Sequence, residues 1–419
     1  MKVLFILNTT IMGGANISLL NLVKGLIAKG VDVAFVAPDK DPKFLSHASQ
    51  LGITMYFAPV IFSVTSEDNS GWLRRIFHAL HSSEILVRTK YASYCGLCSI
   101  VEQYHPDIIH TNVGVNHEGY DVAKLYGIPH VWHLREYQDS DFDMHFYPSK
   151  EFFCQRLKDP YVITITKDIL HHFGLKEDEK HRVIYNGIMS ENDTHYIENK
   201  ERYFLCASRI DPSKGHVDVI KAFSSVHQSH PDYRLRILGF GSEGYLSELK
   251  LLAKQLGCAD AIDWVGYTEE VSEHMQHATA LIVASKFEGF GRMTAEAFFN
   301  GCMVIGRNTG GTKEIMDQTG GIPFMGGPEK LAKKMEQVII MTNEEYKDIV
   351  LKGQKKAAET FSIEQNIEHI FDMYQYISHR NQLITDKRSN HLTFIDKLKF
   401  ILLLLKEQTQ YILDVIIQK

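Results

Sequence analysis

Short apolar segments alternate with helix-length amphipathic segments along most of the chain, and this alternation restricts the possible fold more than any other feature. Such alternation is typical of parallel sheets covered by helices. We therefore predict an α/β fold. In the first half, the predicted strands cover residues 2–7, 31–37, 53–58, 107–112, 130–134, 161–166 and 182–185.

The same strand–loop–helix pattern restarts in the second half of the chain. After Asn186-Gly187 comes a polar segment without an apolar period, and strands follow again at residues 202–208, 233–239, 261–266, 280–285 and 302–306. The duplication predicts two Rossmann-like, doubly wound domains that face each other across a cleft. The predicted boundaries are 1–186 for the first domain, 187–200 for a linker, 201–360 for the second domain, 361–380 for a closing or crossover helix and 381–419 for a tail.

Two helices are predicted beyond Phe361. In the crossover helix, Ile363, Ile367, Ile370, Phe371 and Tyr374 recur at helical spacing. The tail is an amphipathic helix over 394–417 that is strongly apolar apart from a narrow polar stripe. Its unbroken apolar run is far shorter than the ~20 residues of a membrane-spanning helix. The stripe consists of Asp396, Lys399, Lys406, Gln410 and Asp414.

Charge and cysteine content exclude several classes of protein. The chain has 45 basic and 51 acidic residues, a formal net charge of -6, which argues against a nucleic-acid binder. The apolar run at the N-terminus is too short for a secretory signal. Six cysteines in 419 residues, four of them scattered, do not form a disulfide framework, so we expect reduced thiols and a cytoplasmic location. Cys95 and Cys98 lack further Cys or His partners nearby and are interpreted as helix-packing residues.

The most informative segment lies after the predicted strand at 280–285. Glu288 is followed by glycines in a loop, and Glu296 falls near the first turn of a helix that Met293 or Thr294 would open. Glycines allow close approach of a ligand, and the free N–H groups of a helix start attract a diphosphate. Two carboxylates beside an anion should instead accept hydrogen bonds from neutral hydroxyls of sugar and ribose. The combination predicts a nucleotide-sugar site.

The segment from Ser285 to Ile315 resembles the E-x7-E signature of the retaining GT-B glycosyltransferases of family 4 (glycosyl transferase group 1), and the likeness extends along most of residues 1–380. The resemblance implies that Glu288 contacts hydroxyls of the donor sugar and that Glu296 binds the ribose. It places backbone groups of Phe290 and Gly291 along the sugar and phosphates. Arg292 stands where the family often has an apolar residue, which predicts an added acceptor or phosphate contact. Met293 and Thr294 complete the predicted donor-binding segment.

Two cations follow the first strand of the second half. Arg209 and Lys214 would converge if the turn at Pro212 folds the loop back, and fixed cations can stabilise a leaving nucleoside diphosphate without a metal. The family's G-R-x5-K-G pattern is matched here, except that Ser208 replaces its usual glycine. The resemblance also places Tyr267 and Thr268 near the nucleobase.

The first half contributes two predicted elements. By resemblance, the Gly13-Gly14 loop abuts the donor phosphates, a contact that the absence of side chains would permit. His133 ends a predicted strand and resembles the active-site His that contacts the donor sugar near the reacting centre. The resemblance therefore implies His133, Arg209, Lys214 and Glu288 as the catalytic set.

Two other functions stay open on sequence alone. Residues 239–244 spell G-x-G-x-x-G, which is the fingerprint of an NAD(P)-dependent oxidoreductase, but the motif follows the second strand of its domain rather than the first. A catalytically silent transferase-fold partner subunit is the non-enzymatic alternative. Asp139-Ser140-Asp141 and Asp141-Phe142-Asp143 mimic the D-x-D metal site of a different transferase fold. We expect no cofactor and no metal.

The acceptor is the least constrained part of the prediction. Residues 71–90 form a basic amphipathic segment suited to an anionic membrane surface, and with the apolar tail it favours a lipid-linked acceptor at the inner face of the cytoplasmic membrane. Helices packed on their own domain explain both segments equally well. The predicted reaction is transfer of a sugar, with retention of configuration, from a UDP- or GDP-sugar to a glycan or lipid-linked hydroxyl in surface polysaccharide synthesis. The basic and apolar residues of segment 71–90 that carry this prediction are Trp72, Arg74, Arg75, Ile76, Phe77, Leu80, Arg88 and Lys90.

Overall fold

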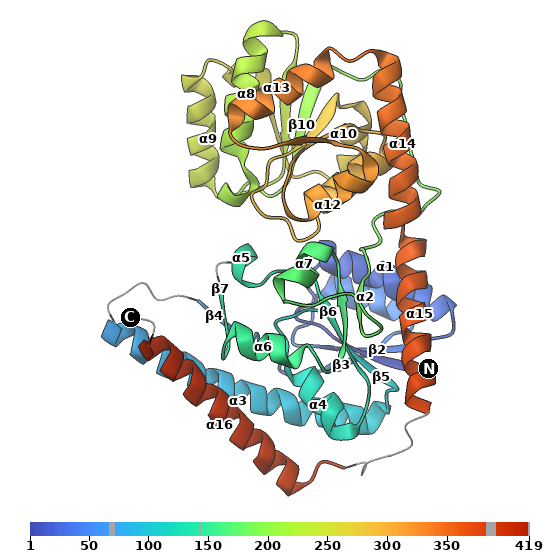
Figure 1. Cartoon of the computed structure of the whole chain (residues 1–419), viewed down its shortest axis with the longest axis vertical. Coiled ribbons are helices and arrows are strands. Elements are labelled where there is room, and N and C mark those ends of the chain that lie inside the picture. The colour runs from blue at the N-terminus through green and yellow to red at the C-terminus, as the bar shows by residue number, and fades with distance from the viewer. Residues whose placement is uncertain (67–71, 143, 383–390, 418–419) are drawn as a thin grey trace. The chain divides into compact units, whose positions relative to one another are not determined.

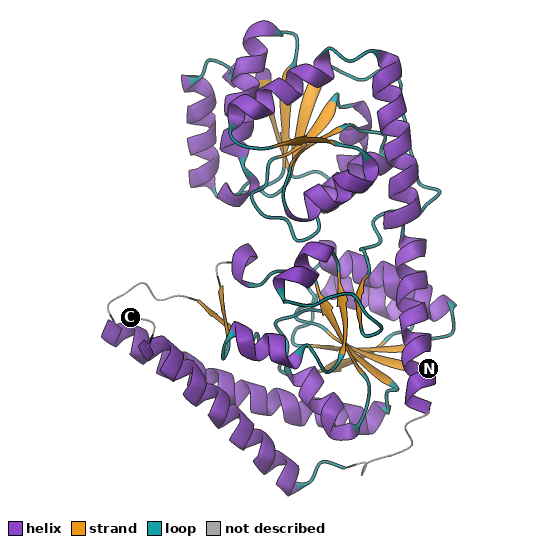
Figure 2. Ribbon diagram, in the orientation of Figure 1, coloured by secondary structure: helices purple, strands orange, loops and turns teal. Residues whose placement is uncertain are grey.

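The chain folds as two compact units in the computed structural model, which describes residues 1–66, 72–142, 144–382 and 391–417. The first unit comprises Met1–Tyr185 and Asn366–Lys419, and the second comprises Asn186–Gln365 (Figure 1). Each unit has a central parallel sheet with helices on both faces (Figure 2). The first unit is therefore built from two separate stretches of the chain.

The first unit contains a seven-stranded parallel sheet in the order β3-β2-β1-β5-β6-β8-β9. The chain runs outward on one side of β1 and then returns to begin the other side with β5. The order therefore reverses between β1 and β5. A short antiparallel ribbon, β4 with β7, lies apart from this sheet. The strands are β1 (Lys2–Ile6), β2 (Asp32–Ala37), β3 (Thr54–Phe57), β4 (Val64–Ser66), β5 (Ile108–Thr111), β6 (His130–Leu134), β7 (Met144–Phe146), β8 (Tyr161–Thr164) and β9 (His181–Val183).

Helices cover both faces of this sheet, and the longest, α3, runs for 33 residues. Aliphatic and aromatic side chains from β1, β2, α1 and α15 form one apolar cluster, while α3, α4 and α16 contribute to another. The helices are α1 (Gly14–Ala28), α2 (Pro42–Gln50), α3 (Trp72–Tyr104), α4 (Glu118–Tyr126), α5 (Asp139–Phe142), α6 (Lys150–Arg156), α7 (Lys167–His172), α15 (Ile363–Gln382) and α16 (Phe394–Ile417).

The second unit contains a six-stranded parallel sheet in the order β12-β11-β10-β13-β14-β15. Its order reverses between β10 and β13, as the first unit's does between β1 and β5. The strands are β10 (Tyr203–Ala207), β11 (Arg234–Leu238), β12 (Ile262–Gly266), β13 (Ala280–Val283), β14 (Val304–Arg307) and β15 (Ile322–Phe324). The helices are η1 (Pro212–Lys214), α8 (His216–Ser229), α9 (Glu243–Gln255), η2 (Ala259–Ala261), α10 (Val271–His277), α11 (Arg292–Phe299), α12 (Gly310–Thr319), α13 (Pro328–Ile339) and α14 (Asn343–Phe361).

The segment assigned to a linker packs on the second unit. The Ile188 N–H donates to the Phe361 carbonyl at 2.9 Å, and the His195 N–H donates to the Phe299 carbonyl at 2.9 Å. The crossover helix α15 lies in the first unit from Asn366 onward, where Ile370, Met373, Tyr374 and Ile377 are buried. Helix α15 packs so closely on α1 that a Cβ at Gly25 would lie 2.1 Å from Ile367 Cδ1.

The C-terminal helix α16 lies beside α3 in the first unit (Figure 1). Its buried residues are Phe400, Leu404, Glu407 and Tyr411, and the Phe400 ring stacks on Tyr94 of α3 at 3.8 Å between centroids. The face turned to solvent carries Leu398, Leu402, Leu405, Leu413 and Ile416, each at least 44% exposed. Helix α16 thus buries a carboxylate and exposes a row of leucines. Among the described residues, no helix is both long and apolar enough to cross a membrane.

Candidate functional site

In the second unit, the loops that follow β10 and β13 meet at the point where the strand order reverses. Ligands of open α/β sheets bind outside the carboxyl ends of the strands at such a point. The Lys286 N–H donates to the Ser213 carbonyl at 2.9 Å, which ties the two loops together. A Cβ at Gly215, which has a φ of 75°, would lie 2.3 Å from the Ala284 carbonyl oxygen, so only glycine allows this approach.

Lys214 and Glu288 join the same two loops through their side chains. Lys214 Nζ lies 2.6 Å from Glu288 Oε1, and both side chains are 20% exposed. Asp211 orients the turn because its carboxylate accepts hydrogen bonds from the N–H and the hydroxyl of Ser213. These bonds lower the pKa of Asp211. Arg209 is exposed on the same loop. The predicted residues of both loops are therefore neighbours at one end of the sheet.

The loop after β13 is held against the start of α12. The Gly311 N–H donates to the Glu288 carbonyl at 2.8 Å, and a Cβ at Gly311 would lie 2.1 Å from the Phe290 carbonyl oxygen. Phe290 is buried, with its ring edge-on to Phe361 at 5.9 Å. Gly291 has a φ of 87° and caps α11. The segment from Glu288 to Gly291 is therefore rigidly placed.

Helix α11 begins at Arg292, so the prediction that Met293 or Thr294 opens it is wrong by one or two residues. Glycine at 291 can take a left-handed conformation at the cap, and this lets the helix start earlier than the apolar pattern indicates. Two buried hydroxyls, those of Thr294 and Thr312, flank Gly291 and have no hydrogen-bond partner among the described residues. Unsatisfied buried donors beside a helix start are available to a ligand.

Glu296 is paired within its own helix. Arg292 Nε donates to Glu296 Oε1 at 2.6 Å, an i,i+4 ion pair with side chains 29% and 15% exposed. Burial raises the pKa of Glu296, and the Arg292 charge partly opposes that rise. Met293 is half-buried on the same turn. Glu288 and Glu296 thus each face a cation.

Tyr267 and Thr268 follow β12 at the same end of the sheet. Tyr267 is 70% exposed, and its ring lies 6.3 Å from Phe240, which is 63% exposed and follows β11. The Thr268 hydroxyl accepts a hydrogen bond from the Glu270 N–H at 3.1 Å. Two exposed aromatic rings at a strand end offer a stacking surface for a flat ligand. Tyr267 was predicted from the sequence, whereas Phe240, which lies inside the G-x-G-x-x-G motif, was not.

In the first unit, the loop between β1 and α1 is fixed by Asp39. The Asp39 carboxylate accepts hydrogen bonds from both hydroxyls of Thr9 and Thr10 and from the Thr10 N–H, and these bonds lower its pKa although burial acts in the opposite direction. The loop carries Gly13 to the start of α1, which begins at Gly14. An added Cβ at Gly13 would meet nothing within 4 Å, so packing inside the unit does not require glycine there.

His133 is fully buried near the end of β6. Its Nδ1 lies 3.2 Å from His110 Nε2 and 3.4 Å from Arg135 Nη2, while its Nε2 has no hydrogen-bond partner among the described residues. His110 Nδ1 lies 2.5 Å from the Tyr374 hydroxyl. Burial, and next the Arg135 charge, lower the pKa of His133 well below its usual value. Sequence reasoning missed His110, although a His inside an otherwise apolar strand was a readable signal.

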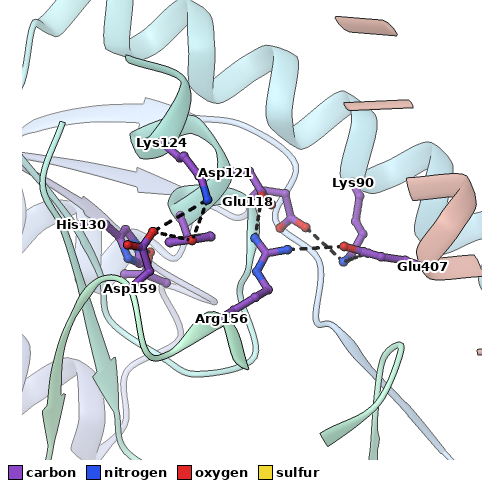
Figure 3. Close-up of polar contacts among 10 residues, drawn as sticks. Lys90, Glu118, Asp121, Lys124, His130, Arg156, Asp159 and Glu407 are labelled. Carbon is purple, nitrogen blue, oxygen red and sulfur yellow. Dashed lines mark hydrogen bonds and ion pairs between the residues drawn. The ribbon is translucent and has the colours of Figure 1, made fainter. Parts of the chain in front are cut away.

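A buried ion network links α3, α4, α6 and α16 (Figure 3). Lys90 Nζ lies 3.0 Å from Glu407 Oε2 and 3.8 Å from Glu118 Oε1, and Arg156 bridges Asp121 at 2.5 Å and Glu407 at 3.4 Å. Lys90 is 1% exposed. The prediction that Lys90 belongs to a basic surface is therefore wrong, because the sequence pattern could not place Glu407 opposite it.

The structure also places the cysteines and the aspartate motif. All six cysteines are free thiols. Asp139 is engaged by Lys150 and His172, each at 2.8 Å. Asp143 lies outside the described residues, and the side chain of Asp141 is not described. Within the described ranges, no three His, Cys, Asp or Glu side chains gather in a way that could hold a metal ion.

Known proteins resemble the chain in sequence and in fold. Residues 12–192 match the family model described as Glycosyltransferase Family 4, and residues 190–356 match the one described as Glycosyl transferases group 1. The chain is 29% identical over 160 residues to poly(glycerol-phosphate) alpha-glucosyltransferase of Bacillus subtilis, an alignment that covers 37% of this chain.

A second relative is the N-acetylgalactosamine-N,N'-diacetylbacillosaminyl-diphospho-undecaprenol 4-alpha-N-acetylgalactosaminyltransferase of Campylobacter jejuni, which is 28% identical over 33% of this chain. The chain spans only 24% and 38% of the lengths of these two relatives.

Solved structures share the fold over most of the chain. HepE of Anabaena, in complex with UDP and glucose, superposes with a TM-score of 0.68 at 19% identity, covering 90% of this chain and 99% of HepE. Sucrose-phosphate synthase of Thermosynechococcus elongatus gives a TM-score of 0.69 at 16% identity, covering 90% of this chain and 99% of the synthase.

Fold and site together define the class: the protein has the GT-B fold, with two parallel α/β units whose predicted ligand loops lie at the points of strand-order reversal. The chain belongs to the glycosyltransferases of family 4, since the two family models together match residues 12–356.

Proposed function

We propose that the protein is a glycosyltransferase that takes a sugar from a nucleoside diphosphate sugar. The observation that carries this proposal is the Lys214–Glu288 pair at the strand-order reversal of the second unit. In the proposed complex, Glu288 accepts hydrogen bonds from donor sugar hydroxyls, and Lys214 turns to the diphosphate. The Gly291 cap and the start of α11 receive a phosphate. Tyr267 and Thr268 lie at the nucleobase and Glu296 at the ribose.

The proposed reaction retains configuration at the anomeric carbon. The acceptor hydroxyl attacks that carbon from the face that the diphosphate leaves, the bond from carbon to the diphosphate oxygen breaks, and the departing phosphate oxygen takes the proton of the hydroxyl. Arg209 and Lys214 stabilise the charge that develops on the leaving group. The protein contributes orientation and electrostatics, and the reaction proceeds without a metal.

The proposed acceptor is a hydroxyl of a glycan or a lipid-linked glycan in polysaccharide synthesis. Support comes from the two relatives, whose names specify transfer to a glycerol-phosphate polymer and to a diphospho-undecaprenol-linked sugar. The donor class is supported by HepE, which was solved with UDP and glucose.

We further propose peripheral contact with the anionic inner face of the cytoplasmic membrane through α16 and the start of α3. The exposed row of leucines on α16 is flanked by exposed Lys399 and Lys406, and Phe77 of α3 is 70% exposed beside exposed Arg74. Apolar side chains flanked by bases suit an anionic lipid surface. The side chains of Trp72 and Arg75 lie outside the described set. Lys90 takes no part, because it is buried.

A donor screen tests the proposed function. Purified full-length protein is incubated with UDP- and GDP-sugars and with lipid-linked or glycerol-phosphate acceptors, and the anomeric configuration of the product is read by NMR. A product with the configuration of the donor supports the proposal. UDP binding without turnover over all acceptors would instead indicate a silent partner subunit, and tight NADH binding without UDP binding would indicate an oxidoreductase. Activity lost with EDTA and restored by manganese would contradict the metal-free mechanism.

A further inference from the structure

Four side chains in the first unit form a continuous hydrogen-bonded chain that ends on His133. Tyr374 on α15 contacts His110 on β5, His110 contacts His133 on β6, and Arg135 contacts His133 from the end of β6. His110 and His133 are completely buried, and the His110 ring also stacks on Phe5 with centroids 4.5 Å apart. Such packing holds both imidazoles in one orientation.

The Arg135 guanidinium determines which atoms carry the protons in this series of hydrogen bonds. Arg135 can only donate hydrogen bonds, so the His133 Nδ1 that faces its Nη2 must be the acceptor. Arg135 is itself fixed, since its Nε and Nη2 donate to the side-chain oxygen of Asn112 at 3.2 and 3.0 Å. Burial lowers the pKa of Arg135 only to about 10, so the group stays charged at neutral pH.

The proton positions on His110 and Tyr374 follow from that of His133. Because His133 Nδ1 accepts, His110 must donate to it from Nε2–H, so His110 Nδ1 is unprotonated and accepts from the Tyr374 hydroxyl. The reverse arrangement would point a His133 Nδ1–H at Arg135 and place two donors face to face. Burial lowers the pKa of both imidazoles well below the usual value, so both are neutral.

We propose that Tyr374, His110 and Arg135 are positioning residues that hold His133 as the neutral Nε2–H tautomer. His133 Nε2 is buried and has no hydrogen-bond partner within the described residues. A fixed N–H without a protein partner is a preorganised donor for an oxygen of the bound sugar. His133 then acts as a hydrogen-bond donor and neither as a base nor as a cation. This role rests on the proposed function, but the tautomer does not.

The tautomer is tested on the free protein by NMR of histidine labelled with ¹⁵N. The His133 signals are assigned by their loss in His133→Gln. We expect the chemical shift of an unprotonated nitrogen at Nδ1, a protonated Nε2, and no titration at neutral pH. A protonated Nδ1 would overturn the inference whether or not the protein transfers sugar. Failure of the donor screen with the expected tautomer present would overturn only the proposed function.

Tyr374→Phe tests the remote end of the chain, with Tyr376→Phe as the matched control. Tyr376 lies on the same helix, but its hydroxyl contacts Glu179 at the surface. In Tyr374→Phe we expect a second, Nδ1–H population at His110 or His133 and a kcat lowered about tenfold with KM little changed, which is the effect of one weakened hydrogen bond. Tyr376→Phe should match the wild type. Spectra of His110 and His133 that are identical in Tyr374→Phe and wild type would remove Tyr374 from the proposal.

Discussion

Lys214 Nζ and Glu288 Oε1 lie 2.6 Å apart, and this side-chain contact joins the loops that follow β10 and β13. The pair stands where the strand order of the second unit reverses, so a ligand at that point meets a cation and a carboxylate together. In the proposed complex, a diphosphate competes with Glu288 for the lysine and thereby frees the carboxylate for hydroxyl groups. In this proposal, donor binding exchanges an internal ion pair for two contacts with the ligand.

Removal of the Lys214 ammonium should affect turnover more than folding. For Lys214→Ala we expect kcat to fall by about 10²- to 10³-fold, the usual effect of losing one group that stabilises transition-state charge. Lys286→Ala is the control, because Lys286 is exposed on the neighbouring loop and contributes its backbone N–H to Ser213. Steady-state kinetics checks both variants. A Lys214→Ala enzyme within a few-fold of wild type would refute the leaving-group role.

A side chain at Gly311 should disturb the donor loop. The added methyl of Gly311→Ala would lie 2.1 Å from the Phe290 carbonyl oxygen, so the backbone must shift. We expect a loss of about 1–3 kcal/mol in the free energy of unfolding, as for other overpacked sites, together with weaker UDP binding by calorimetry.

The control for Gly311→Ala is Gly244→Ala on α9, where a Cβ meets nothing within 4 Å. Alanine in a helix should be neutral or stabilise the protein by up to ~1 kcal/mol. Equal UDP affinity in wild type and Gly311→Ala would show that the loop position does not matter for the nucleotide.

Glu407 should be essential for docking of α16. Glu407→Ala would leave Lys90 and Arg156 with fewer counter-charges in a buried site, and breaking a buried pair in this way costs about 3–5 kcal/mol of unfolding free energy. Lys406→Ala, at the exposed neighbouring position, should change stability little. Urea unfolding followed by circular dichroism measures both. A Glu407→Ala protein as stable as the Lys406→Ala protein would show that the ion network does not stabilise the docking of α16.

Glu118 should give the stability a distinctive pH dependence. Burial raises its pKa from 4.5 to about 7; the Lys90 charge opposes this rise, and the neighbouring carboxylates of Asp121 and Glu407 add to it. The folded state therefore binds more protons than the unfolded state between pH 4.5 and 7, and this contribution to stability is lost as pH rises through that range. The unfolding free energy of Glu118→Gln, measured relative to wild type at the same pH, should therefore be lower at pH 5 than at pH 8. If the urea midpoints of Glu118→Gln and wild type differ by the same amount at pH 5 and at pH 8, the raised pKa of Glu118 is excluded.

The exposed leucines of α16 should govern binding to anionic vesicles. Leu402, which is 58% exposed, is replaced by Glu and binding to phosphatidylglycerol-containing vesicles is measured by co-sedimentation. Loss of one apolar contact and addition of a negative charge should weaken binding about tenfold. Leu351→Glu, an exposed leucine on α14 of the second unit, should bind like the wild type. If both variants pellet equally with vesicles, lipid does not bind this face of α16. The same holds if the wild-type protein is a dimer and Leu402→Glu is a monomer.

The sequence predicted the elements whose apolar residues are numerous. The strands that form the centres of the two sheets all overlap segments expected from apolar runs, because buried parallel strands need nearly continuous hydrophobic sequence. Strands β4, β7 and β15 were missed, since each has only three residues and too few apolar positions to show a period.

Contacts between distant parts of the chain were beyond the reach of local patterns. Glu407 lies 317 residues from Lys90, and Tyr374 lies 264 residues from His110. No spacing rule connects such positions. Candidate site residues in the second unit were easier to propose, because the motif puts Glu288 and Glu296 within one strand–loop–helix segment. Their pairing with Lys214 and Arg292 required the structure.

The crossover helix α15 has a consequence for the order of assembly during synthesis. The second unit is one uninterrupted stretch and has its whole core, whereas the first unit lacks Ile370, Met373, Tyr374 and Ile377 until the chain beyond the second unit has been made. The N-terminal half therefore leaves the ribosome before its own core can close, which reverses the usual N-to-C order of domain folding. The contact between Tyr374 and His110 is among the last to form, because Tyr374 arrives with that final segment.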